Sequence, residues 1–206
     1  MPDEGSSAAS TVPESEIRVH GQDINNIKAD SVILRQSSAQ DIQAERVSLS
    51  QSGANSINAD SVELRQAGAQ TIQGNTVTVR QGGAVQAKAG QLMITQGGVI
   101  YAETDEAVLT AANAGAILAR GNVTLDQSMA RVVLSRGDVT VDQGGSGVIV
   151  GRNIQTGDNS GTILLLAGRV DGEVNTVFGP VASAAFGAGF ALMLGFLFWL
   201  KRNFFN

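Results

Sequence analysis

The sequence predicts an all-β protein, a parallel β-solenoid (β-helix) of about eleven turns of 15–16 residues, followed by one C-terminal transmembrane α-helix. Three observations support this fold class. The motif V-x-L-x-Q-x-G-A-x-x-I-x-A-x-x repeats every fifteen residues from Ile17 to about Glu173. Aromatic residues are almost absent before Phe178. An uncharged segment of twenty-one residues runs from Pro180 to Leu200.

Apolar residues recur at fixed places in the repeat. The first column is Ile17, Val32, Val47, Val62, Val77, Leu92, Ala107, Val123, Val139, Ile154 and Val170. The second column is Val19, Leu34, Leu49, Leu64, Val79, Ile94, Leu109, Leu125 and Val141. A column of small residues follows, with Ala39, Ala54, Ala69, Ala84, Val99, Ala114, Ala130 and Ser146, and then Ile27, Ile42, Ile57, Ile72, Ala87, Ala102, Leu118, Leu134 and Ile149. The period of two, interrupted by Gly, Ser, Asn and Asp, is typical of short strands joined at corners.

Units this short cannot enclose a core alone, so they must stack. Tyr101 is the only aromatic residue among the first 177, which indicates an interior too narrow for large rings. A long helix or coiled coil is the main alternative, because fifteen residues are close to four helical turns. The Gly-Gly pairs at 82–83, 97–98 and 144–145 and the β-branched columns oppose it.

A glutamine follows the second column in most repeats. We predict that these residues form a structural amide ladder, in which stacked side chains donate to and accept from each other along the rod: Gln36, Gln51, Gln66, Gln81, Gln96, Gln127 and Gln143. A ligand-binding row is the alternative. The glycines two residues later are expected at a corner that needs positive φ: Gly53, Gly68, Gly83 and Gly98.

The pattern loosens after Ala107. One residue is inserted before Val123 and another before Val139, which predicts longer or bulged corners around an unchanged interior. The run from Thr162 to Ala167 carries apolar residues on both faces of the expected strand. We expect this last turn to be covered by membrane, a partner or another copy.

The predicted organisation is an acidic, disordered tail at 1–16, the solenoid at 17–173, a linker at 174–179, the transmembrane helix at 180–200 and a basic and aromatic tail at 201–206. As a helix, residues 180–200 would span about 31 Å, the thickness of a hydrocarbon core. A buried helix of the soluble domain is the alternative. Membrane-interface anchors are Trp199, Lys201 and Arg202. Small residues recur every four positions and predict a transmembrane self-association face: Gly179, Ser183, Gly187, Ala191 and Gly195.

Two observations disagree about the membrane topology. Lys201 and Arg202, compared with Asp171 and Glu173, favour a cytoplasmic C-terminus with the rod outside. The first sixteen residues, however, lack the positive start and apolar run of an export signal. We expect a single-pass, tail-anchored protein with a cytoplasmic solenoid, and the extracytoplasmic arrangement stays open.

Several functional classes are disfavoured. The chain has no cysteine, a net charge of −5 and no basic patch, so we expect no thiolate site and no nucleic-acid partner. His20 is the single histidine and is expected at the surface of the first turn. Asp126 and Asp142 share a column and form at best a weak cation-binding edge. We predict no cofactor, no metal site and no enzymatic activity, since a polysaccharide lyase would need clustered charges and aromatic sugar platforms.

The short Val- and Ile-rich turns, the polar N-terminal tail and the heptapeptide G-R-V-D-G-E-V from Gly168 to Val174 resemble bactofilins, the polymer-forming bacterial cytoskeletal proteins. The resemblance covers residues 17–174 in architecture. It implies end-to-end polymerisation, no nucleotide and a scaffold role at the membrane. The tight fifteen-residue repeat and the C-terminal apolar segment depart from that family's pattern.

The expected function is therefore that of a membrane-anchored structural protein, whose stiff rod acts as a scaffold or spacer and self-assembles in a bactofilin-like way. Its expected partners are membrane lipid and other copies of itself, with an unknown protein partner left open. The alternative is an extracytoplasmic, adhesin-like stalk that presents one face of the solenoid to a partner.

Overall fold

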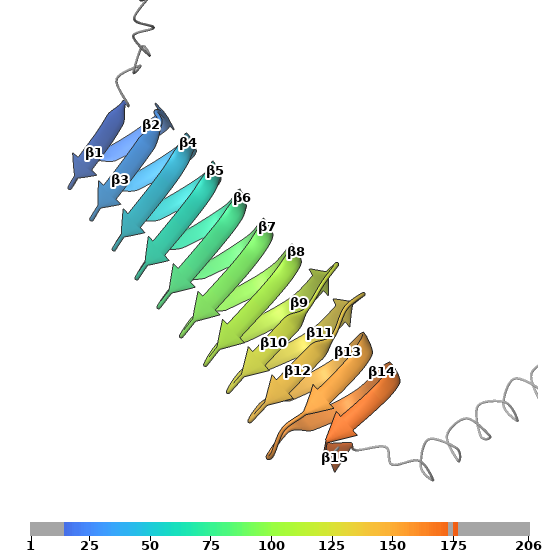
Figure 1. The fold of residues 1–206 in the computed structure, drawn as a ribbon. Coiled ribbons are helices and arrows are strands. Elements are labelled where there is room, and N and C mark those ends of the chain that lie inside the picture. The colour runs from blue at the N-terminus through green and yellow to red at the C-terminus, as the bar shows by residue number, and fades with distance from the viewer. Residues whose placement is uncertain (1–14, 173–174, 177–206) are drawn as a thin grey trace, which may run out of the picture.

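The computed structural model describes residues 15–172 and 175–176, and these residues form a straight rod of stacked strands (Figure 1). The strands are β1 (Glu16–His20), β2 (Asp23–Lys28), β3 (Ser31–Arg35), β4 (Ser38–Ser50), β5 (Gly53–Arg65), β6 (Gly68–Arg80), β7 (Gly83–Thr95), β8 (Gly98–Thr110), β9 (Asn113–Ala119), β10 (Val123–Asp126), β11 (Met129–Ser135), β12 (Val139–Asp142), β13 (Gly145–Thr156), β14 (Gly161–Gly172) and β15 (Asn175–Thr176). Every pairing among them is parallel. The predicted parallel β-solenoid is confirmed.

The first apolar column is in register along the whole rod. Ile17 pairs with Val32, and the pairing continues turn by turn to Ile154 and Val170. The first column has eleven members, and eleven stacked strands enclose about ten complete turns. The expected number of eleven turns is therefore one too many. At about 4.8 Å per strand spacing, the rod is about 48 Å long.

The interior consists mainly of aliphatic side chains of modest size. In the turn that runs from β5 into β6, the side chains of Val62, Leu64, Ala67, Ala69 and Ile72 are each at most 8% exposed. The same positions repeat above and below, so each inward side chain packs on its column neighbours at the strand spacing. Burying a Val, Leu or Ile contributes about 1.5–3 kcal/mol, and this term is repeated in every turn.

One predicted inner column is wrong at two of its members, Leu118 and Leu134, and correct at Ile149. Ala102 pairs with Ile117, which pairs with Val133 and then Ile149. Ile117 and Val133 are fully buried. Leu118 and Leu134 lie one position further along the strand and point outward, because the extra residue of the sixteen-residue turns is added after them.

That extra residue lies at one corner. Residues 120–122 separate β9 from β10, and residues 136–138 separate β11 from β12. The amide of Gly121 still donates to the carbonyl oxygen of Asp105 at 2.7 Å. The predicted lengthening of the corners is confirmed, and the pairing of the flanking strands is kept.

Candidate functional site

The glutamine column forms an exposed corner. Gln36 Nε2 donates to Gln51 Oε1 at 3.2 Å, and the same bond joins Gln51 to Gln66, Gln66 to Gln81 and Gln81 to Gln96. Ala111 then interrupts the column. No side-chain hydrogen bond joins Gln127 to Gln143, although both belong to the described part of the chain.

The same glutamines, and not the glycines, adopt the left-handed backbone conformation. Their φ values lie between 46° and 54°, and Ala111 has 50°. Gly53, Gly68, Gly83 and Gly98 do not have positive φ, so that prediction is wrong. A non-glycine residue in this region costs about 1 kcal/mol, and the amide bonds of the ladder offset part of that cost.

The ladder does not resemble a ligand site. The grooves beside it are lined by Arg65, Arg80 and Thr95 together with the glutamines, and they are open to solvent. Each internal amide already uses one donor and one acceptor on its neighbours. The arrangement therefore stabilises one corner by joining successive turns.

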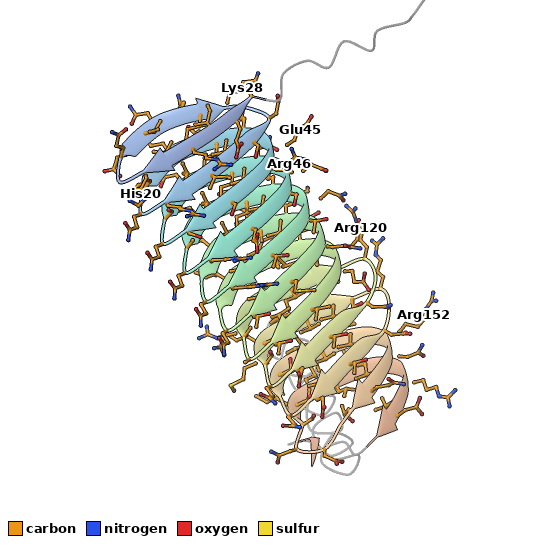
Figure 2. All side chains as sticks on the ribbon, turned by 60° about the vertical axis from the view of Figure 1, so that its left-hand side comes forward. His20, Lys28, Glu45, Arg46, Arg120 and Arg152 are labelled. Carbon is orange, nitrogen blue, oxygen red and sulfur yellow. The ribbon has the colours of Figure 1, made fainter. Side chains whose placement is uncertain are left out.

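His20, Asp126 and Asp142 do not form a catalytic or metal-binding cluster in the described part of the chain. His20 is exposed at one long edge of the rod, opposite the edge that carries Arg120 and Arg152 (Figure 2). Asp126 and Asp142 are register neighbours. Among the residues described, no group of three or more His, Cys, Asp or Glu side chains is placed to hold a metal ion.

The predicted transmembrane helix, its self-association face and its interface anchors all lie outside the described residues, as do positions 1–14 of the predicted tail. Within residues 15–172 and 175–176, no helix has the length and apolar character needed to cross a bilayer.

A surface of different character lies on the C-terminal half of the rod. We call it the C-terminal face and define it as residues 113–120, 129–136, 145–152 and 161–168. These segments read NAGAILAR, MARVVLSR, GSGVIVGR and GTILLLAG. Their strands, β9, β11, β13 and β14, are neighbours in the sheet. The face contains no acidic residue and four arginines.

Large apolar side chains point outward from this face. Ile163 is 52% exposed, Leu166 is 53% exposed and Met129 is 64% exposed. Leu118, Leu134, Val150 and Leu166 form one outward column in register. A second outward column of Ala116, Val132, Val148 and Leu164 runs beside it.

Arginines border the apolar columns. Arg120, Arg136 and Arg152 occupy the corner that follows the leucine column, and Arg131 lies on the other side of it. Arg120 Nη1 lies 3.2 Å from Asp105 Oδ1, at the boundary of the face. No carboxylate of the described chain pairs with Arg131, Arg136 or Arg152.

Shallow grooves follow both borders. One, of about 480 Å³, is lined by Leu118, Leu134, Arg120 and Arg136. Another, of about 660 Å³, is lined by Met129, Arg131 and Ile163. Both are open, so they fit a broad apolar or anionic surface better than an enclosed small molecule.

Only the last turn of this face is predicted from the sequence. The apolar run from Thr162 to Ala167 is expected to be covered, whereas the predicted inner column includes Leu118 and Leu134. The signal was present in three tripeptides, Leu118-Ala119-Arg120, Leu134-Ser135-Arg136 and Val150-Gly151-Arg152, which repeat an apolar residue and an arginine on one side of a strand. Comparison with known proteins adds no further identification, since no family model, no curated protein and no solved structure matches the chain.

Proposed function

We propose that this protein is a membrane-anchored, non-enzymatic structural element, in which the solenoid acts as a stiff scaffold or spacer. The observation that carries the proposal is the unbroken register of the first apolar column from Ile17 to Val170. A rod whose strands stay paired in one register through about ten turns has no interruption at which to bend. Its mechanical continuity is therefore its main property.

The polar groups of the rod are used internally. No buried side-chain nitrogen or oxygen lacks a hydrogen-bond partner in the described residues. Even at the corners, backbone amides bond to the neighbouring turn, as Gln66 N does to Arg80 O at 2.9 Å. A rod whose buried polar groups are satisfied within the fold is well suited to a structural role.

Anchoring is proposed from the sequence of residues 180–200. The segment has no charge and is long enough to cross a bilayer as a helix. Anchoring is tested by floating the full chain with vesicles after an alkaline wash, with a variant that ends at residue 176 as the control. Full chain that stays in the aqueous fraction would contradict anchoring.

The side of the membrane requires a separate measurement. We propose a cytoplasmic rod, and protease added to intact cells should leave it uncut while permeabilised cells lose it. The extracytoplasmic stalk is the competing proposal. Cleavage in intact cells would favour the stalk and reject the cytoplasmic arrangement.

Self-assembly is a further part of the proposal. β1 pairs only with β3, so the outer edge of Glu16–His20 has no strand partner among the described residues. An unpaired edge is a template for another strand. Deleting residues 1–14 should increase end-to-end filaments in electron micrographs, and a rod that remains monodisperse with and without the tail would contradict end-to-end assembly.

Association through the membrane segment has its own test. Replacing Gly187 and Gly195 by Ile should weaken self-association in a membrane two-hybrid assay, because close approach of two helix backbones requires small residues. Replacing Leu192 and Leu194 by Ile is the matched control with unchanged small residues. Equal signals from the two variants would reject the self-association face.

A further inference from the structure

We propose that the C-terminal face lies against the surface of an anionic bilayer, so that the second half of the rod rests on the membrane. The placement of the rod near a bilayer rests on the proposed anchoring, whereas the contact itself follows from the described residues. The partner is a lipid surface with negatively charged headgroups.

The C-terminal face exposes a continuous apolar surface. Outward apolar residues continue through four neighbouring strands, from Leu118 on β9 to Leu166 on β14. Ile163, Leu164 and Leu166 are 52%, 45% and 53% exposed. A continuous exposed apolar surface of this kind marks an interaction site in soluble proteins.

The second argument is charge. Arg131, Arg136 and Arg152 lie at the borders of the apolar columns, without carboxylate partners in the described chain. Among the acidic residues of the same turns, Asp126 and Asp142 lie beside the glutamine corner. Asp138 lies in the corner of Arg136, but its carboxylate accepts a hydrogen bond from Asn153 Nδ2 at 2.7 Å and forms no ion pair with the arginines of the described chain. An apolar surface bordered by arginines is the arrangement that binds anionic membrane interfaces.

A second copy fits this face less well. If two C-terminal faces met, their apolar columns would be buried, but the arginines would meet only other arginines and no acid. If the arginines instead met the acidic corner of an antiparallel copy, at Asp30, Glu45 and Asp60, the apolar columns would lie on the polar N-terminal half. Neither arrangement satisfies both properties of the face.

The chain path agrees with the lipid partner. Thr176 on β15 pairs with Thr162 on β14, next to the exposed Ile163. Three residues separate Thr176 from Pro180, and the four steps of chain between these two Cα atoms can span at most about 14 Å. If Pro180 enters the bilayer, the apolar end of the C-terminal face lies close to the lipid surface.

The absence of cysteine from the sequence permits a direct test. An environment-sensitive fluorophore is attached to Leu134→Cys in the full chain, which is reconstituted in vesicles of phosphatidylcholine with or without phosphatidylglycerol. Nitroxide-labelled lipids then report contact by quenching. The matched controls are Thr140→Cys, on another side of the same turn, and Gln43→Cys, the equivalent of Leu134 in the N-terminal half.

We expect strong quenching and a blue shift at position 134 in anionic vesicles, and weak quenching at positions 140 and 43. Replacing Arg131, Arg136 and Arg152 together by Gln should lower the quenching at 134 toward the value in phosphatidylcholine alone. Far-UV circular dichroism shows whether each variant keeps the fold.

Two results would overturn the inference. One is equal quenching at 134, 140 and 43 in chain that floats with the vesicles, which would leave the proposed anchoring intact. The other is a blue shift at 134 that grows with protein-to-lipid ratio without nitroxide quenching, which would show a second copy on the face. Loss of flotation with retained quenching at 134 would reject the anchoring and support the lipid contact.

Discussion

The two halves of the rod share one interior and differ on the outside. Residues 23–30, 38–45, 53–60 and 68–75 occupy the same positions within the repeat as the C-terminal face, but they carry five acidic residues, one lysine and no leucine. The buried columns pass from one half to the other without a break. Folding therefore constrains the inward positions, while the outward positions of the same strands are free to specialise.

The boundary between the halves is marked by ion pairs. Glu103 lies 3.5 Å from Lys88 Nζ and 3.7 Å from Arg120 Nη2, and Asp105 also contacts Arg120. The corner that carries Asp30, Asp60 and the neighbours Glu45 and Arg46 in the first half carries three arginines and Asp138 in the second. One edge of the rod thus becomes more positive after the turn of β8.

The strongest test of the shared interior compares two leucines of the second half. Leu125→Ala should lower the free energy of unfolding by about 3 kcal/mol, because the side chain is fully buried and leaves a cavity. Leu134→Ala should change it by less than about 0.5 kcal/mol, since that side chain is 38% exposed. Equilibrium denaturation measures both, and similar losses would place Leu134 in the core.

Substitution of a glycine on the C-terminal face should also affect stability more than substitution at the equivalent position of the first half. A Cβ atom added at Gly147 would lie 2.5 Å from the carbonyl oxygen of Arg131 in the turn before. We expect Gly147→Ala to destabilise the rod by about 1–3 kcal/mol through overpacking. Gln70→Ala, at the equivalent position of the first half, should stay within about 0.5 kcal/mol by thermal unfolding. A stabilised Gly147→Ala variant would contradict the close stacking of these turns.

The glutamine ladder predicts a smaller effect confined to the first half. Gln66→Ala removes the amide bonds to Gln51 and Gln81 and should cost about 1 kcal/mol. Gln127→Ala removes no side-chain hydrogen bond and should be near neutral. Gln66→Gly should be less harmful than Gln66→Ala, because glycine adopts the φ of 50° without strain. Chemical denaturation measures the stability of the three variants. Equal stabilities of Gln66→Ala and Gln127→Ala would show that the ladder contributes nothing.

The smallest effect is expected at the boundary ion pairs. Arg120→Gln should change stability by less than about 0.5 kcal/mol, since exposed pairs contribute little. Its side chain is 68% exposed. The difference from the parent chain should vanish at about 1 M salt, where the screening length is about 3 Å. A larger or salt-independent loss would show that the guanidinium packs against the rod.

The sequence predicted the interior better than the surface, for a physical reason. Inward columns such as Val62 and Leu64 repeat in every turn because each packs on its neighbours, so the period of fifteen reveals them. Outward residues have no such partner within the fold. Leu118 and Leu134 were misassigned because an aliphatic residue next to a buried column satisfies the same pattern one position away.

The left-handed corner was also beyond what the sequence alone could predict. Glycine tolerates positive φ most easily, so Gly68 was expected there, but the structure places Gln66 in that conformation. Compensation comes from bonds between turns, such as the 3.2 Å contact of Gln66 with Gln81. Local preference alone cannot reveal a stabilisation that depends on residues fifteen positions away.

Because each turn of the first half contains fifteen residues, the rod can be lengthened by whole repeats. Duplicating residues 68–82 would add one turn, lengthen the rod by about 4.8 Å and leave every later residue at the same angle around the axis. The bordering arginines would still face the direction they face now. An insertion of five residues would instead put the buried columns out of register or loop out at a corner, as the extra residue before Val123 does, so the reach of such a rod changes by whole repeats.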